Sequence, residues 1–297
     1  SINIAGIILK NPVMPASGTF GSGQEYSEFV DLNKLGAVVT KGVSYYPWEG
    51  NPTPRIIETS SGMINAVGLQ NPGIDVFIKR DIPFLKQFDT KIIVNVCGNT
   101  ITDYLKVVEC LSNQPVDMLE INISCPNVEH GGIAFGQEPK MVEHITAEIK
   151  KITRTPITMK LTPNVTDITE IARAAEAGGA DAISLINTIT GMVIDTKKRK
   201  FSVANKTGGL SGPAIKPIAL RMVYQVYHAV RLPIIAMGGI SSTNDALEFI
   251  MAGATGIAVG TANFNNPFVM PEIIDGLERY MTENKIKDFE EIRGIVN

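Results

Sequence analysis

The stretch Glu120-Ile121-Asn122-Ile123-Ser124-Cys125-Pro126-Asn127 is the part of the sequence around which the rest of the chain can be organised. Residues 118–123 alternate well enough to form a buried strand, and Pro126 cannot donate a further ladder hydrogen bond. Cys125 is therefore predicted to lie just past the C-terminal end of a strand, between Asn122 and Asn127. This position matters for function only in a fold that gathers strand ends around one site.

Short runs rich in β-branched and apolar residues recur along the chain, and segments with helical periodicity separate them. Most of these runs are continuously apolar, as expected for strands that helices cover. Helices are expected at 168–177, 213–230 and 244–252, with Thr166 or Asp167 as the cap of the first and Thr243 or Asn244 as the cap of the last. The eight predicted strands are residues 13–16, 37–41, 92–96, 118–123, 157–161, 182–187, 234–238 and 256–260.

Eight strand and helix pairs predict an α/β fold of the (β/α)8 TIM-barrel type. The alternative, a doubly wound sheet, would have a GxGxxG turn after its first strand, but the glycines there are Gly18, Gly21 and Gly23. No change in composition marks a linker, so residues 1–297 are expected to form a single domain. Long insertions follow strands two and six, at 41–91 and 187–233, and connections of this length usually act as lids or binding loops.

The composition excludes several classes of protein. With 44% hydrophobic and 19% charged residues and a net charge of -3, the chain is expected to be soluble and to lack a basic surface for nucleic acid. It has neither an apolar run of about 18 residues nor a secretory signal, so we expect a cytoplasmic protein without a membrane segment. The spacing of its cysteines fits no zinc site or disulfide framework, and Cys97 and Cys110 are expected to be structural. The three histidines, expected on the surface or on helix faces, form no metal-binding pattern: His130, His144 and His228.

Polar residues at nearly every predicted strand end indicate an active site at the C-terminal face of a barrel. Any one of the asparagines could be only a turn former, but the set together favours a site. Glycine pairs after strands seven and eight could let backbone N–H groups approach a phosphate, although they could also simply turn the chain. The strand-end residues are Ser17, Lys41, Asn95, Asn122, Cys125, Lys160, Asn187, Thr188, Gly238-Gly239 and Gly260-Thr261.

Lys160 ends an otherwise apolar strand, where a buried ammonium needs an anion or a developing negative charge nearby. Two roles fit: a Schiff base with a carbonyl substrate, or stabilisation of a reduced, anionic flavin. A surface lysine with only its stem packed is the alternative, and Lys41 has the same interpretations. Cys125 is either an inert buried thiol or, because its neighbours are polar, a nucleophile or base.

Long motifs throughout the chain resemble the catalytic subunit of dihydroorotate dehydrogenase, in its cytosolic two-subunit branch called class 1B. They are residues 15–21 (PASGTFG), 50–55 (GNPTPR), 65–73 (NAVGLQNPG), 122–128 (NISCPNV) and 208–217 (GGLSGPAIKP). The resemblance implies a single FMN-binding barrel that oxidises dihydroorotate to orotate in pyrimidine biosynthesis. Cys125 would be the catalytic base that removes a proton while a hydride passes to FMN. The membrane-associated branch has serine there and an N-terminal helical extension, so the cysteine and the lack of an extension support the soluble branch.

The resemblance also implies the residues that contact each ligand. Lys160 would lie at the pyrimidine edge of the flavin and favour the negative charge of the reduced state. The FMN contacts would be Ser17, Lys41, Gly42, Asn95, Asn122, Lys160, Ile186, Gly212, Gly238, Gly239, Gly260 and Thr261. The substrate contacts would be Lys41, Asn65, Ala66, Val67, Gly68, Leu69, Asn122, Asn127, Asn187 and Thr188.

Residues 124–132 and 17–21 resemble the NAD-linked form, in which electrons pass to NAD through a second subunit that carries FAD and an iron–sulfur cluster. The resemblance implies a homodimer of catalytic subunits within a heterotetramer. This chain has no cysteine cluster that could hold the iron–sulfur centre, so the partner would supply it. Two rivals remain at this stage: a lysine aldolase of the same fold that uses Lys160, and a non-catalytic binding barrel.

Overall fold

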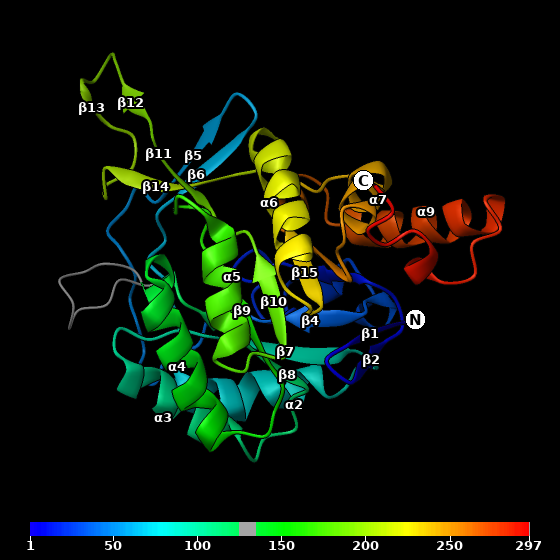
Figure 1. Cartoon of the computed structure of the whole chain (residues 1–297). Helices are drawn as coiled ribbons and strands as arrows, with labels where there is room; N and C mark the ends of the chain where they lie inside the picture. The colour runs from blue at the N-terminus through cyan, green and yellow to red at the C-terminus, as the bar shows by residue number, and fades with distance from the viewer. Residues whose placement is uncertain (125–134, 297) are drawn as a thin grey trace.

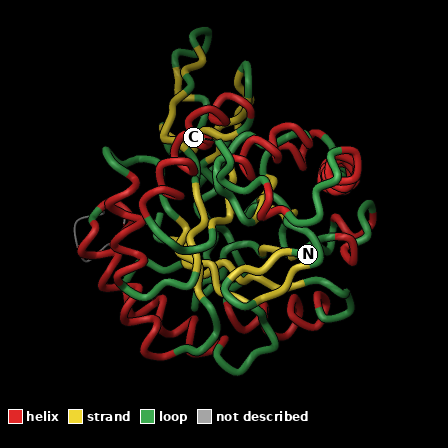
Figure 2. Tube along the Cα trace, turned by 45° about the vertical axis from the view of Figure 1, so that its right-hand side comes forward, coloured by secondary structure: helices red, strands yellow, loops and turns green. Residues whose placement is uncertain are grey.

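A ring of eight parallel strands forms the centre of the molecule in a computed structural model that describes residues 1–124 and 135–296 (Figures 1 and 2). The strand order is β3-β16-β15-β10-β9-β8-β7-β4. The N–H of Gly36 donates to the carbonyl of Val13 over 3.0 Å, which brings the two end strands of this order together. The predicted TIM barrel is confirmed. Its strands are β3 (Val13–Pro15), β4 (Ala37–Val39), β7 (Lys91–Val96), β8 (Met118–Asn122), β9 (Ile157–Lys160), β10 (Ala182–Leu185), β15 (Ile234–Met237) and β16 (Gly256–Val259).

Helices surround the barrel, as the red outer shell of Figure 2 shows. Alternate strand residues point to opposite sides, because side chains on a strand have a period of two. Leu119 and Ile121 of β8 pack in the outer core with the helices, whereas Met118 packs in the inner core with Ile93 and Ile235. The helices are α1 (Ile74–Val76), α2 (Ile82–Leu85), α3 (Ile101–Leu111), α4 (Pro139–Ile152), α5 (Ile168–Ala177), α6 (Lys216–Ala229), α7 (Thr243–Met251), α8 (Ala262–Asn265) and α9 (Val269–Glu283).

The N-terminal end of the barrel is closed by a hairpin of β1 (Ile2–Ile4) and β2 (Ile7–Leu9). Ile4 and Leu9 of this hairpin are buried against the inner core, together with Met14 of β3. This apolar hairpin covers the N-terminal ends of the strands, so a site inside the barrel mouth is expected at their C-terminal ends. This is the end at which TIM barrels carry their ligands.

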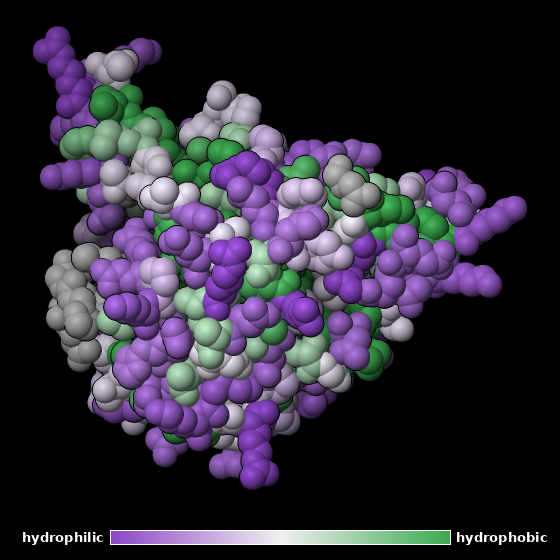
Figure 3. All heavy atoms as spheres, viewed as in Figure 1, coloured by the Kyte–Doolittle hydropathy of each residue, from purple (hydrophilic) through white to green (hydrophobic). Residues whose placement is uncertain are grey.

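The two long insertions pair with each other to form a second sheet above the barrel, at the upper left of Figure 1. Its strand order is β11-β14-β6-β5, and β14 of the second insertion lies antiparallel to β6 of the first, with Leu210 opposite Ile64. The strands are β5 (Ile56–Thr59), β6 (Gly62–Asn65), β11 (Ile189–Met192) and β14 (Thr207–Ser211). A further hairpin, β12 (Ile194–Asp195) and β13 (Lys200–Phe201), projects from this sheet; in Figure 3 hydrophobic atoms lie towards the base of the projection and hydrophilic atoms at its tip.

Helix α5 has the predicted bounds and is capped by Asp167, whose side chain accepts from the N–H of Thr169. The predicted cap of α7 was wrong. Ser242 caps this helix by accepting from the N–H of Asp245, one residue before the earlier of the two candidates. All eight predicted strands exist. Seven of them, including β8, end one or two residues earlier than predicted, whereas β7 ends at Val96 as predicted and begins one residue earlier. The residues that follow the strands turn into the cavity described below. No helix in the described part of the chain is long and apolar enough to cross a membrane.

Candidate active site

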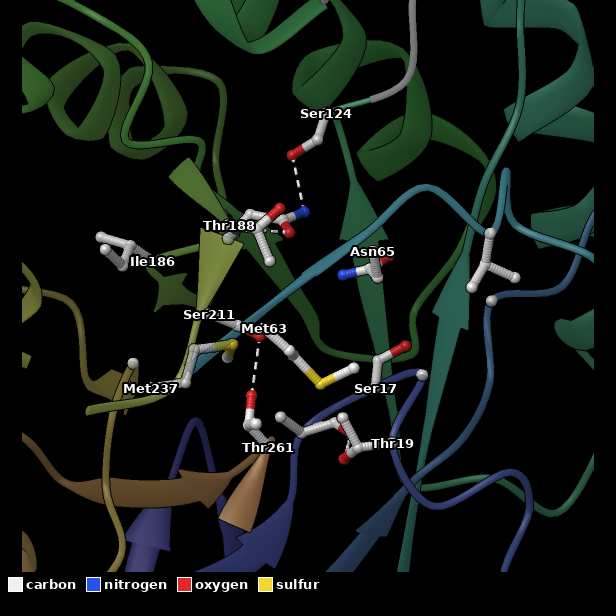
Figure 4. A pocket seen from close by; sticks show the side chains of 18 of the residues that line it. Ser17, Thr19, Met63, Asn65, Ser124, Ile186, Thr188, Ser211, Met237 and Thr261 are labelled. Carbon is white, nitrogen blue, oxygen red and sulfur yellow. Dashed lines mark hydrogen bonds between the residues drawn. The ribbon is translucent and has the colours of Figure 1, made fainter. Parts of the chain in front are cut away.

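A cavity of about 380 Å³ lies at the C-terminal ends of the barrel strands (Figure 4). Strand ends provide one part of its wall, and the insertion sheet provides another through Met63 of β6 and Ser211 of β14. With one exception, every predicted FMN or substrate contact within the described residues lines this cavity. Cys125 and Asn127 lie outside the described residues.

Asn95 is the exception, because it lies behind the cavity wall rather than in it. Its side chain is fully buried, and its amide donates to Glu120 Oε1 over 2.6 Å. The carbonyl oxygen of the Asn95 side chain has no hydrogen-bond partner, and a Cβ added to Gly42 would lie 3.0 Å from it. Asn95 was grouped with the strand-end residues, although the strand was predicted to end at Val96, as β7 does, and its side chain belongs to the barrel interior.

Lys160, at the end of β9, is 4% exposed and reaches the cavity wall. The alternative that it is a surface lysine is therefore wrong. Its Nζ lies 3.4 Å from Glu120 Oε1, in a pair in which Glu120 is 1% exposed. The sequence predicted an anion near this ammonium but did not identify Glu120 as that anion. A signal was present, because Glu120 precedes Asn122 by two positions and therefore points to the same side of β8.

Lys41 follows β4 and is the second cation of the cavity wall. Burial lowers the pKa of its ammonium below the ordinary value of 10.5, and the nearby charges of Lys160 and Arg55 lower it further, while Cys97 opposes them. None of the described residues that line the cavity is acidic. The cavity therefore favours anionic ligands, and an anion beside Lys41 would recover part of the cost of burying its charge.

The ends of β8 and β10 are joined by side-chain amides. Asn187 donates to Ser124 Oγ over 2.8 Å and to Asn122 Oδ1 over 3.4 Å, and Asn122 Oδ1 also accepts from the N–H of Ser124. Below them, the hydroxyl of the buried Tyr104 on α3 donates to the carbonyl of Asn122 over 2.6 Å. These contacts fix the orientation of two amides at the cavity, where they can bind a planar ring that carries amide groups.

Glycines make the wall near β15 and β16 a surface of bare backbone. A Cβ at Gly260 would meet no described atom closer than 3.7 Å, so its position is open towards the cavity. Among the residues that the structure describes, the N–H groups of Gly239, Gly260 and Thr261 donate to no protein acceptor. Such unpaired donors suit the oxygens of a phosphate. The residues present therefore fit a phosphorylated group such as FMN.

Several wall residues were not predicted from the sequence. One of them is Ser211, whose Oγ accepts a hydrogen bond from Oγ1 of the predicted residue Thr261 over 2.7 Å. This bond connects β14 to the residues after β16 (Figure 4). Ser124 and Thr19 had signals, because both lie within motifs that the resemblance quoted. Met63, Met237 and Phe264 had none, because an apolar residue at a cavity has the same sequence pattern as one in the core.

A parallel barrel with two lysines, oriented amides and free backbone donors at its C-terminal end is typical of a barrel enzyme that binds a phosphorylated ligand. The family model described as dihydroorotate dehydrogenase matches residues 1–281. The chain belongs to this family.

The curated relatives cover nearly the whole chain. A protein of Lachnoclostridium phytofermentans is 65% identical over 296 residues, which are 100% of this chain and 99% of the relative. Proteins of Alkaliphilus oremlandii and Geobacter sulfurreducens are 64% and 55% identical, and each alignment covers 99% of this chain and 97% of the relative. All three relatives are called dihydroorotate dehydrogenase B (NAD(+)), catalytic subunit.

Proposed function

We propose that this protein is an FMN-dependent enzyme that oxidises dihydroorotate to orotate in pyrimidine biosynthesis. The observation that carries the proposal is the cavity itself, whose wall combines two lysines and the amides of Asn65, Asn122 and Asn187 with the unpaired N–H groups after β15 and β16. The lysines and amides suit a ring that carries amides and a carboxylate, and the unpaired N–H groups suit a phosphate. Family membership and the names of the relatives support the same activity.

The chain's own residues have separate tasks in this proposal. Lys41 and the segment 65–69 bind the anionic substrate, and Asn122 and Asn187 orient its ring. Cys125 removes the proton from the ring carbon adjacent to the one that loses its hydride. Bound FMN supplies the two-electron acceptor. Lys160 would hold its cation beside the flavin ring, where a fixed positive charge would favour the negative charge that reduction brings.

A Schiff-base aldolase is a weaker interpretation of the same cavity. Its lysine must be a free amine, whereas Lys160 Nζ is paired with the buried carboxylate of Glu120 at 3.4 Å. The carboxylate contacts the same Nζ that would have to attack a carbonyl carbon. The pair therefore supports a role of Lys160 in charge stabilisation. A passive binding barrel has no use for a cation held in this way at its cavity wall.

The proposal includes a second subunit with FAD and an iron–sulfur cluster, with NAD as the final acceptor. The names of the relatives, which describe a catalytic subunit of an NAD(+) enzyme, support the second subunit and NAD, whereas FAD and the iron–sulfur cluster rest on the sequence resemblance. A homodimer of catalytic subunits within a heterotetramer, a single FMN-binding domain and a cytoplasmic location are further parts of the proposal, and they rest on the sequence resemblance.

The test is the absorbance of the purified protein. We expect a bound flavin that is released as FMN on denaturation, and we expect dihydroorotate to bleach its absorbance anaerobically while orotate forms in equal amount. Dihydroorotate without protein and protein without dihydroorotate are the controls. A protein that cannot be loaded with FMN, or a loaded protein that dihydroorotate does not bleach, contradicts the proposal.

A further inference from the structure

The pair of Glu120 and Lys160 crosses the boundary between the barrel interior and the cavity. Lys160 lines the cavity, whereas Glu120 is not part of its wall. In the register of β8 and β9, Asn122 lies opposite Lys160 and Glu120 lies opposite Thr158, so Glu120 is one layer deeper in the barrel. The carboxylate therefore approaches the ammonium from below, on the side away from a ligand.

Glu120 is held in place by more than its partner. Asn95 donates to the same oxygen, Oε1, over 2.6 Å, compared with 3.4 Å for Lys160 Nζ. The short contact with the neutral amide of Asn95 fixes the carboxylate. The longer ionic contact allows the ammonium group of Lys160 to extend towards the cavity. Removal of the carboxyl charge should therefore change the field at the cavity more than it changes the packing.

The layer around the pair is unusually polar for a barrel interior. Four buried side-chain atoms in the described part of the chain lack a hydrogen-bond partner, and three of them belong to Asn95, Thr158 and Ser184. Thr158 is opposite Glu120 in register, and Ser184 is opposite Lys160. Buried polar atoms without partners cost stability, and their concentration around one ion pair is typical of a functional group rather than of packing.

We propose that Glu120 is a positioning residue that holds Lys160 and offsets its charge, and so limits how strongly the site stabilises reduced flavin. This inference rests on the proposed function. Two electrons bring negative charge to the flavin, which Lys160 favours and Glu120 opposes. A site with an unopposed lysine would retain the electrons more strongly. The carboxylate therefore keeps the electrons available for onward transfer to an acceptor of low potential, such as a nicotinamide.

The test is the reduction potential of the FMN-loaded protein, measured at fixed pH against a reference dye. Glu120→Gln should favour the reduced state by about tenfold, which for a two-electron couple is a shift of about 30 mV to more positive potential. Glu120→Asp keeps the negative charge, so its potential should lie close to that of the unchanged protein. Equal shifts in the two variants, or no shift in either, would overturn the inference.

Asp181→Asn is the matched control for a lost carboxylate beside a lysine. Asp181 accepts from Lys150 over 2.7 Å and from the N–H of Ile157, at the other end of β9 from the cavity. The potential of this variant should equal that of the unchanged protein. A shift as large as that of Glu120→Gln would show that any lost carboxylate acts in this way, and would overturn a specific role for Glu120.

The Glu120→Gln variant leaves the charge of Lys160 without its partner and could fail to fold for that reason. A second comparison tests the inference in that case. The double variant Glu120→Gln with Lys160→Gln removes both charges, a change that buried pairs often tolerate. Its potential should be close to that of the unchanged protein, and Lys160→Gln alone should be lower by about 30 mV. Equal potentials in the single Lys160→Gln variant and the double variant overturn the inference. If the unchanged protein does not bind FMN, that result contradicts the proposed function rather than the role of Glu120.

Discussion

The side-chain amide of Asn187 donates to the hydroxyl of Ser124 over 2.8 Å and thereby links the end of β10 to the last described residue after β8 (Figure 4). The same amide lies 3.4 Å from Asn122 Oδ1. The N–H of Thr188 in turn donates to Asn187 Oδ1 over 2.8 Å. Asn187 thus connects three residues of the cavity, and its orientation is set by protein contacts before a ligand binds.

Asn187→Ala should weaken the binding of orotate to the FMN-loaded protein by about tenfold, because one or two hydrogen bonds to the ring are lost. An equilibrium titration with orotate gives the affinity. Thr190→Val is the control, because Thr190 is exposed and does not line the cavity. Equal affinities in the Asn187 and Thr190 variants would contradict a substrate contact at Asn187.

Cys125→Ala should preserve FMN binding but slow the reduction of flavin by dihydroorotate by roughly two to four orders of magnitude, the usual contribution of a positioned base. Stopped-flow absorbance measures this rate. Cys125→Ser should lose less and shift activity to higher pH, because a hydroxyl is a poorer acid than a thiol. Cys110→Ala is the control, since Cys110 lies on α3 and not in the cavity wall. An unchanged rate in Cys125→Ala would remove Cys125 from the mechanism.

Gly260→Ala should lower the affinity for FMN by tenfold or more while the apoprotein keeps its melting temperature. The added methyl group meets no described atom closer than 3.7 Å, so it projects into the space that the ligand would fill. Fluorescence quenching of FMN during titration measures the affinity. Gly191→Ala adds a methyl group against Ile64 outside the cavity wall, and it should bind FMN normally. Normal FMN affinity in Gly260→Ala would argue against a flavin at this wall.

Lys41→Met should raise the melting temperature of the apoprotein by a few degrees at neutral pH. Burial lowers the pKa of Lys41 in the folded protein below its ordinary value of 10.5, so the unfolded chain binds more protons between these two pKa values. The cost of the buried charge is thus full below the folded pKa and disappears as the pH rises towards 10.5.

The gain from Lys41→Met should accordingly shrink as the pH rises through this window. Thermal unfolding of both proteins from pH 7 to pH 10.5 measures the difference, with Lys198→Met as the control because Lys198 is exposed. If the difference in melting temperature stays constant over this pH range, removal of a buried charge is not the cause of the stabilisation.

Much of the fold could be predicted from local pattern. The apolar runs of β8 and β9 are buried on both sides, so their sequences are continuous enough to be found without any knowledge of their neighbours. Lys41, Asn122 and Lys160 could be predicted as site residues because parallel strands place their ends on one face. The cap of α7 could not, because Ser242, Thr243 and Asn244 are all good capping residues, and only the backbone geometry selects one of them.

The sequence by itself determined the barrel, the face that carries the cavity and the family, since each depends on patterns within single segments. The tertiary structure decided which groups meet. Glu120 and Lys160 are 40 positions apart, and β6 and β14 come from different insertions, so no local pattern joins them. Their pairing follows from the register and order of the strands, which form only when the whole barrel closes. For this reason the sequence predicted a lysine in need of an anion, and only the fold identified the anion.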